Sequence, residues 1–184
     1  GGGARGGGSR RRSRVAPGVV VLAPVGYGAQ RALKRDVGGR EYAASGTIEV
    51  GREHIRQFAD AMEDPNPVYR DPAAARAAGH DDVIAPPTFL TVLGFRFGMD
   101  SPMLDPDLGL NYALVVHGEQ RFALHRPVRA GDILSSVSRV DAIRDAGRNE
   151  LMTMVTEVTG AAGDRVATLT STLVSRGTAT TGQA

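Results

Sequence analysis

The chain has 184 residues, a length typical of one domain, and 41% of them are hydrophobic, which is enough for an ordinary core. It contains no cysteine, which excludes disulfides, thiolate metal sites and a cysteine nucleophile. No run of about 18 apolar residues is present, so we expect no membrane-spanning helix. The four histidines lack the spacing of a metal site, and the sequence therefore implies no bound metal.

Charge is unevenly distributed along the chain. Residues 1–40 hold nine basic residues and one acidic residue, a net charge of +8. Residues 41–184 hold thirteen basic and nineteen acidic residues, a net charge of −6. The body of the protein is therefore mildly acidic, and the N-terminal arm supplies the basic charge.

The first 14 residues are mostly glycine and arginine, with almost nothing to bury, which predicts disorder. Three interpretations of this arm remain open: a targeting signal, a contact for nucleic acid or another polyanion, or a solvated tail. No aromatic residue lies among the arginines to stack on a base. We favour the solvated tail, and we expect a cytoplasmic protein with no membrane or nucleic-acid partner. The expected organisation is an arm over 1–36, one domain over 37–176 and a flexible tail over 177–184.

The first half of the body contains helical signals. Residues 47–50 predict a short strand, and Gly51 opens a helix over about 52–62 whose apolar residues recur at helical spacing. Prolines then end this helix, and a short alanine-rich helix follows, with Pro72 in its first turn and Gly79 at its end.

A third helix is expected over about 88–97, with Thr88 as its cap. It is apolar nearly all round, so it should be buried on most sides. After it, strands are expected near 114–125, 132–143, 149–159 and 165–175, joined by short glycine-containing loops. The order of elements predicts an α+β domain in which an antiparallel sheet wraps around a central helix.

Two polar segments carry the candidate chemistry. The segment from Asp64 to Tyr69 contains two prolines, which fix the directions of its polar side chains. Taken alone, it is most simply a helix stop with Asp64 and Asn66 as turn residues. The segment 84–88 leads into a helix N-terminus, whose free N–H groups suit a carbonyl oxygen that gains charge.

Together with three further motifs, these segments resemble the MaoC-like, (R)-specific hydratase/dehydratase family of hot-dog proteins, over about residues 37–176. The motifs are Ile-Glu-Val-Gly-Arg-Glu (48–53), Asp-Pro-Asn-Pro-Val-Tyr (64–69) with Asp71-Pro72, Val-Ile-Ala-Pro-Pro-Thr-Phe (83–89), His-Gly-Glu-Gln-Arg-Phe (117–122) and Arg-Pro-Val-Arg-Ala-Gly-Asp (126–132). The chain is most similar to the non-catalytic-type subunits of heterodimeric (3R)-hydroxyacyl-thioester dehydratases. The resemblance implies a single hot-dog domain and no metal or organic cofactor.

In active members of that family, an Asp and a His five residues later hold one water between them and act as base and acid. Here Asp64 matches the Asp, but Tyr69 stands at the His position. Tyrosine has a reference pKa of about 10, so it is a poor base near neutral pH. Active members usually have glycine where this chain has Pro87, and a backbone N–H at this helix start supports the enolate oxygen that forms. Proline has no N–H, so Thr88 or Phe89 would have to supply that donor here. We infer a subunit that is weakly active or inactive alone, with Asp64 vestigial or supporting.

The resemblance therefore implies a partner. Either a second hot-dog subunit with the complete Asp–His pair joins this chain, or the chain pairs with itself. The candidates for substrate binding are Asn66, Thr88, Phe89, Val92, Leu93 and Phe97. The last four could line an acyl tunnel, although simple core packing is the preferred interpretation for most of them.

The sequence leaves four possible functions open. The first, which we favour, is the supporting half of a dehydratase that acts on acyl carrier protein or coenzyme A thioesters in fatty acid elongation. The second is a self-sufficient homodimeric hydratase that uses Asp64 with Tyr69 or His117. The third is a non-catalytic module that binds acyl thioesters, and the fourth is a nucleic-acid contact through the arm.

Overall fold

The computed structural model describes residues 31–43, 46–92 and 102–180. The last four strands are long: β3 (Val115–Leu124), β4 (Ile133–Ala146), β5 (Asn149–Gly160) and β6 (Arg165–Ser175). All four agree closely with the expected ranges. Two short strands, β1 (Glu41–Ala43) and β2 (Ile48–Glu49), precede them. The sequence had predicted β2 but not β1.

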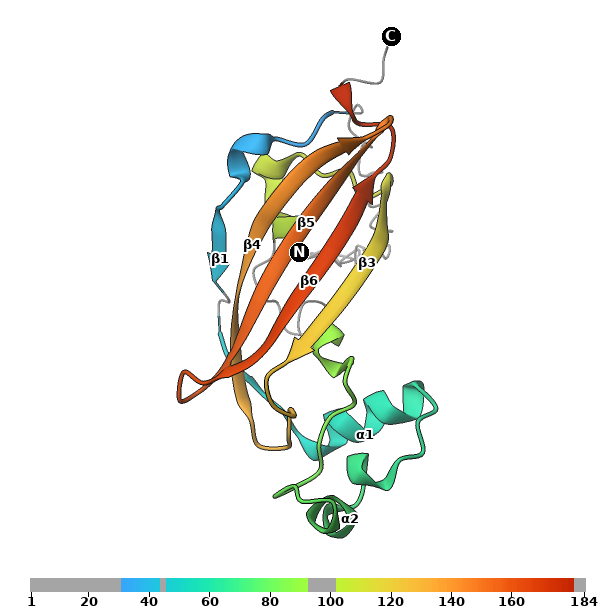
Figure 1. Cartoon of the computed structure of the whole chain (residues 1–184), viewed down its shortest axis with the longest axis vertical. Coiled ribbons are helices and arrows are strands. Elements are labelled where there is room, and N and C mark those ends of the chain that lie inside the picture. Colours follow the sequence, from blue (N-terminus) through green and yellow to red (C-terminus); the bar gives the residue numbers. More distant parts are fainter. Residues whose placement is uncertain (1–30, 44–45, 93–101, 181–184) are drawn as a thin grey trace, which may run out of the picture.

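The strands form one antiparallel sheet of six strands, in the order β1-β4-β5-β6-β3, with β2 also paired to β4 (Figure 1). Along β4, the side chains of Leu134 and Val140 are buried, whereas those of Ile133 and Val137 are exposed, because successive side chains of a strand point to opposite faces. On one border of the sheet only the short β1 and β2 pair with β4. The opposite border is β3, a ten-residue strand with no further strand beside it in the described part of the chain.

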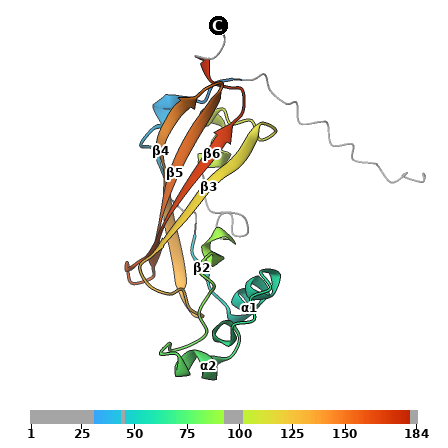
Figure 2. The same ribbon diagram turned by 45° about the vertical axis from the view of Figure 1, so that its right-hand side comes forward.

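Two helices lie beyond one end of the sheet, below it in Figures 1 and 2. They are α1 (Arg52–Ala61) and α2 (Pro72–Ala77). Gly51 precedes α1, and its N–H donates to Nδ1 of His54 at 3.2 Å. Asp71 caps α2, and Pro72 lies in its first turn, where the sequence had predicted it. None of the helices in the described ranges is long and apolar enough to cross a membrane.

Five short 3-10 turns complete the described elements: η1 (Arg35–Val37), η2 (Pro67–Tyr69), η3 (Phe89–Thr91), η4 (Pro102–Leu104) and η5 (Pro106–Leu108). The expected third helix begins as η3, and its remainder over 93–97 lies outside the described residues. Thr88 makes no side-chain cap hydrogen bond, which corrects that expectation. Its carbonyl oxygen instead accepts bonds from the Thr91 hydroxyl at 2.6 Å and the Thr91 N–H at 3.0 Å.

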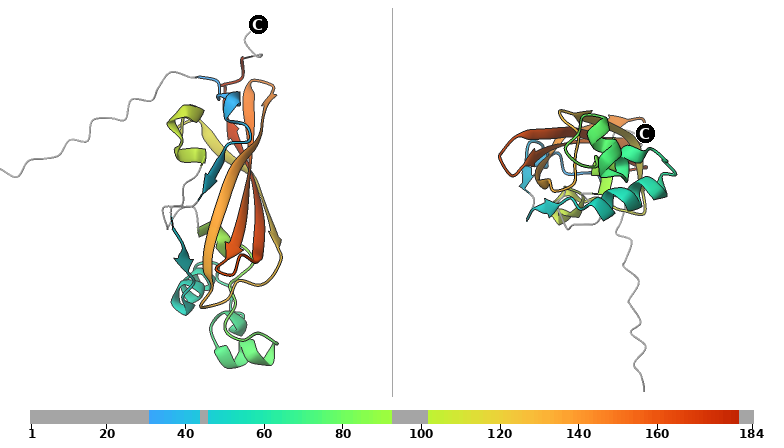
Figure 3. Two further views of the ribbon diagram at one scale, coloured as in Figure 1. Left: turned by 90° about the vertical axis from the view of Figure 1, so that its left-hand side faces the viewer. Right: turned by 90° about the horizontal axis from the view of Figure 1, so that it is seen from below.

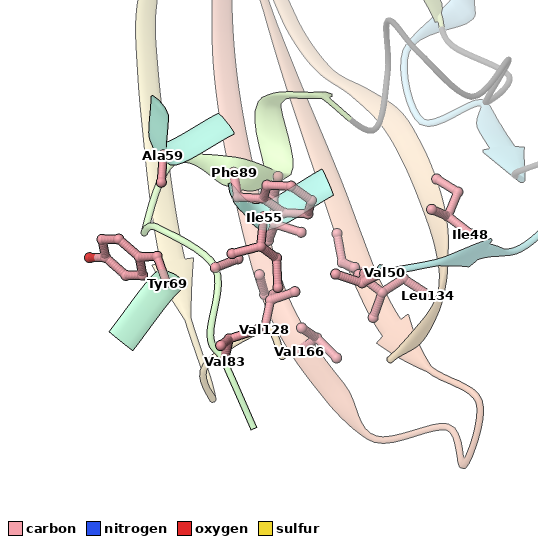
Figure 4. Close-up of a cluster of buried hydrophobic side chains, with 14 of the residues drawn as sticks. Ile48, Val50, Ile55, Ala59, Tyr69, Val83, Phe89, Val128, Leu134 and Val166 are labelled. Carbon is pink, nitrogen blue, oxygen red and sulfur yellow. The ribbon is translucent and has the colours of Figure 1, made fainter. Parts of the chain in front are cut away.

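In the side view of Figure 3, η4 and η5 lie on one side of the long strands, whereas α1 and α2 lie at and beyond their lower end; no described element covers the other side. Two apolar clusters form the core. The larger cluster joins α1, the 83–90 segment and the α1 end of the sheet, as drawn in Figure 4. The smaller one, at the other end, contains Leu33, Val37, Leu108, Val140, Met152 and Leu173. Leu33 is only 3% exposed, so the packed part of the protein extends at least to this residue, upstream of the expected boundary at 37.

Candidate functional site

Asp64 is positioned by the way the chain leaves α1. Its N–H donates to the carbonyl oxygen of Ala59 at 2.9 Å, and the N–H of Glu63 donates to that of Asp60 at 3.0 Å. This pair of bonds is a Schellman motif, in which the residue at the position of Glu63 adopts a left-handed conformation. Glu63 does so with φ 53°, at a cost of about 1–2 kcal/mol relative to glycine. This turn could not be predicted from the residue type, because glutamate does not favour a left-handed conformation.

The side chains of Asp64 and Asn66 bond to the backbone just ahead of them. Oδ1 of Asp64 accepts from the N–H of Asn66 at 3.1 Å, and Oδ1 of Asn66 accepts from the N–H of Val68 at 3.2 Å. These are two successive Asx turns, as expected for a proline-rich helix stop. They hold the loop rigid, while Asp64 stays half-buried and Asn66 stays exposed.

Arg70 reinforces the loop from outside. Its guanidinium bonds to the carboxylate of Asp60 at 2.8 Å and to the carbonyl oxygen of Asn66 at 3.3 Å. The sequence analysis did not single out Arg70, since nothing local indicates that it reaches back to α1. The loop is therefore tied to α1 at both of its ends.

Tyr69 ends the loop with its ring in the larger core cluster and only 8% of the residue exposed. Figure 4 shows its oxygen pointing away from Ile55 and Val128. Burial raises the pKa of Tyr69, and the negative charge of Asp64 raises it further. The phenol therefore stays neutral near pH 7, where it can donate a hydrogen bond but cannot act as a base.

The two motif segments lie side by side. The N–H of Ile84 donates to the carbonyl oxygen of Val68 at 3.2 Å, which joins the 84–88 segment to the loop that carries Asp64. The next residue, Ala85, donates to Val128 at 2.7 Å and so anchors the segment to the turn before β4. Spacing in the sequence could not reveal this contact, which brings the two segments together in the structure.

One of the two expected N–H donors at the helix start is already used. The N–H of Phe89 donates to the carbonyl oxygen of Pro86 at 2.9 Å. Pro87 has no N–H to offer. The N–H of Thr88 is thus the remaining donor at this turn, and it has no acceptor within the described residues.

The candidate tunnel residues divide into three groups. Phe89 is 3% exposed and packs edge-to-face on Phe58, with ring centroids 5.5 Å apart, so it is a core residue. Val92 is only partly buried against the same cluster. Leu93 and Phe97 lie outside the described residues.

His117 is not brought to Asp64 within one chain. It is the third residue of β3, which begins at the end of the sheet remote from α1 (Figure 1). It is exposed, and a β-bulge follows it at Gly118, where an added Cβ would lie 3.1 Å from Val174. No group of three His, Cys, Asp or Glu side chains able to hold a metal occurs in the ranges that the structure describes.

Comparison with known proteins agrees with this arrangement. The family model described as "FAS1-like, dehydratase domain region" matches residues 36–169. A UPF0336 protein of Parafrankia sp. (strain EAN1pec) is 54% identical over 147 residues, which cover 80% of this chain and 97% of that relative. Further relatives, such as one from Saccharopolyspora erythraea that is 52% identical over 141 residues, are likewise named UPF0336 proteins, a name that states no activity.

Two solved structures share the fold. A chain of the C-terminally truncated HadBC (3R-hydroxyacyl-ACP dehydratase) complex from Mycobacterium tuberculosis is 29% identical, with a TM-score of 0.67, covering 77% of this chain and 99% of that one. A MaoC-like dehydratase is 31% identical, with a TM-score of 0.69, covering 76% of this chain and 42% of that one. The expected hot-dog fold is therefore confirmed, and the chain belongs to the FAS1-like dehydratase region family, among the MaoC-like hot-dog hydratases and dehydratases.

Proposed function

We propose that this chain is the supporting, substrate-binding half of a (3R)-3-hydroxyacyl-thioester dehydratase of the cytoplasm, acting in fatty acid elongation. Its partner would be a second hot-dog subunit that carries the complete Asp–His pair. In the reverse direction the same pair of subunits would hydrate a trans-2-enoyl thioester. No metal or organic cofactor takes part, because a water and two side chains are sufficient for the chemistry.

The observation that carries the proposal is the state of Tyr69. Dehydration needs a base for the proton beside the thioester carbonyl and an acid for the departing hydroxide. Asp64 is retained and rigidly held, but the residue beside it is a buried phenol with a raised pKa. Half of the acid–base pair is therefore missing, although the loop that would carry it is intact.

The long open border of the sheet supports a hot-dog partner. Ten residues of β3 leave their outer N–H and carbonyl groups without a strand to pair with in the described residues. Val116 and Leu124 on this strand are 42% and 40% exposed, respectively. Pairing β3 with the equivalent strand of another hot dog would satisfy the backbone groups and cover both side chains.

The thioester substrate is attached to an anionic carrier, either coenzyme A or acyl carrier protein. We expect the partner subunit, and not this chain, to bind that carrier. Two arginines around the Asp64 loop are already paired with carboxylates: Arg52 with Asp82 at 2.6 Å and Arg70 with Asp60 at 2.8 Å. Cations that are already neutralised attract a phosphate or an acidic protein weakly. We therefore assign contact with the phosphates of coenzyme A, or with acyl carrier protein, to the partner subunit.

The test is turnover of a trans-2-enoyl thioester, followed by the loss of absorbance of the conjugated thioester. The chain is assayed alone and mixed with a hot-dog subunit that carries the motif Asp-x-Asn-Pro-x-His. We expect activity only in the mixture, and the Asp→Ala change in the partner's motif should abolish it. Activity of the chain alone that is lost in Asp64→Ala would overturn the proposal.

One feature favours the homodimeric alternative and keeps it worth testing. If β3 paired antiparallel with β3 of a second copy, a register centred on Gln120 would place Glu119 opposite Arg121 at two symmetric positions. Both side chains are exposed, on the strand that forms the open border. Opposite charges in this register would stabilise a pair of identical chains.

A further inference from the structure

Two buried polar atoms lack a hydrogen-bond partner within the part of the chain that the structure describes: Oε1 of Glu150 and Oγ of Ser175. The two residues are 0% and 1% exposed. They are directly opposite each other in the register of β5 and β6. Buried polar groups are almost always satisfied, so two unsatisfied oxygens on neighbouring residues point to one shared partner.

The other contacts of Glu150 define what that partner must supply. Its Oε2 accepts the N–H of Leu33 at 2.9 Å. The guanidinium of Arg35 lies 3.8 Å from Oε1, too far for a hydrogen bond, and it bonds instead to Asp145. Arg35 therefore offsets the charge of Glu150 without hydrogen-bonding to Oε1, which still requires a donor.

We propose that Glu150 and Ser175 bind a single buried water molecule, which donates one hydrogen bond to Oε1 of Glu150 and a second bond to Oγ of Ser175. A water is small enough to lie between cross-strand neighbours, and it can donate and accept at once. A cation would fit this place poorly, because Arg35 already brings a positive charge to the carboxylate.

The water completes an anchor for the N-terminal segment of the domain. Leu33 is bonded to Glu150, the N–H of Lys34 donates to the carbonyl oxygen of Leu108 at 3.1 Å, and Val37 is fully buried. These contacts hold residues 33–37 over the end of the sheet. A carboxylate fixed on both oxygens keeps its position better than one fixed on a single oxygen, so the water stabilises the bond to Leu33.

The test uses Ser175→Ala in the full chain, with Ser138→Ala as the matched control. Ser138 is also a buried strand serine, but its hydroxyl is bonded directly to Thr156 at 2.8 Å. With the water present, Ser175→Ala removes one of its partners. We expect a lower Tm and an exchange of the Leu33 amide hydrogen that is faster by about five- to tenfold, the usual effect of one lost hydrogen bond. Ser138→Ala should lower Tm without changing the exchange at Leu33.

The change in Tm shows whether the hydroxyl of Ser175 bonds to a water or to nothing. Deleting a hydroxyl that bonds to nothing leaves Tm unchanged or raises it, and that outcome would overturn the proposal. A high-resolution crystal structure of the full chain gives the second measurement. Density for a water within about 2.7–3.2 Å of both oxygens supports the site. Direct contact between the two side chains with no water between them rules it out.

Discussion

The carboxylate of Asp64 and the phenol of Tyr69 lie on one short loop and interact electrostatically. Burial raises the pKa of Tyr69, and the charge of Asp64 raises it further. A tyrosine in this environment is a neutral hydrogen-bond donor throughout the physiological range. Under the proposed function, the loop keeps the Asp of the acid–base pair and lacks its histidine.

Replacing Tyr69 by histidine should restore part of the missing chemistry. We expect Tyr69→His to raise hydration of an enoyl thioester by the chain alone by about 10–100-fold, below the usual contribution of a positioned acid–base group because Pro87 still removes an N–H donor. Tyr69→Phe is the control and should give no increase. A folded Tyr69→His variant with unchanged turnover would mean that Asp64 does not face the substrate.

The raised pKa of Tyr69 also predicts how stability changes at alkaline pH. A group whose pKa is higher in the folded state stabilises the protein below its unfolded pKa, here about 10, and this contribution is lost as pH rises through the folded value. We expect the free energy of unfolding to fall above pH 10, and to fall less steeply in Tyr69→Phe. Urea unfolding at pH 7, where both proteins are uncharged at this position, gives the baseline. Parallel curves for the two proteins above pH 10 would contradict the prediction.

Truncation should reveal how much residues 33–36 contribute to the free energy of unfolding. A chain without residues 1–36 loses the buried Leu33 and leaves Glu150 without the nearby charge of Arg35. We expect its free energy of unfolding to be lower by about 3–5 kcal/mol than that of a chain without residues 1–30. Urea denaturation of the two chains measures the difference. Equal stability would show that these contacts contribute little.

Phe89 and Val92 should respond differently to substitution. Phe89 is a buried partner of Phe58, so Phe89→Ala should cost about 3–5 kcal/mol of stability. Val92 is partly buried at the margin of the same cluster. If the proposed two-subunit enzyme forms, Val92→Phe should shift its preference toward shorter acyl chains. Competition between short and long enoyl thioesters measures that preference. An unchanged preference in Val92→Phe removes this residue from the tunnel wall.

Charge swaps on β3 distinguish the two kinds of dimer. Under the proposed heterodimer, Glu119→Arg and the double swap Glu119→Arg with Arg121→Glu should both weaken association with the partner. In a homodimer centred on Gln120, the single change would place like charges opposite each other, and the double swap would restore attraction. Analytical ultracentrifugation at low salt measures self-association of each variant and its association with the partner subunit. Recovery of self-association in the double variant would favour the homodimer.

The sequence by itself determined the elements whose signals are local. Alternation of side chains defined β6 to the residue, and helical spacing with Gly51 and Pro72 located α1 and α2. Turn chemistry also predicted the Asx turns at Asp64 and Asn66, because their bonds span only two residues. The tyrosine at position 69, where active members of the family have histidine, could also be recognised from the sequence, because it follows from the motif alone and not from distances between atoms.

Only the tertiary structure decided the features that join distant parts of the chain. Strand β1 could not be predicted from the sequence, because three residues are too few to show an alternating pattern of apolar and polar side chains. It forms by pairing with β4, where Glu41 lies opposite Arg139. The buried carboxylate of Glu150 accepts the N–H of Leu33, which lies 117 residues away in the sequence. The left-handed turn at Glu63 was equally hidden, since its residue type opposes it and the surrounding contacts impose it. Local patterns follow from the chain's own periodicity, whereas these contacts exist only once the sheet has assembled.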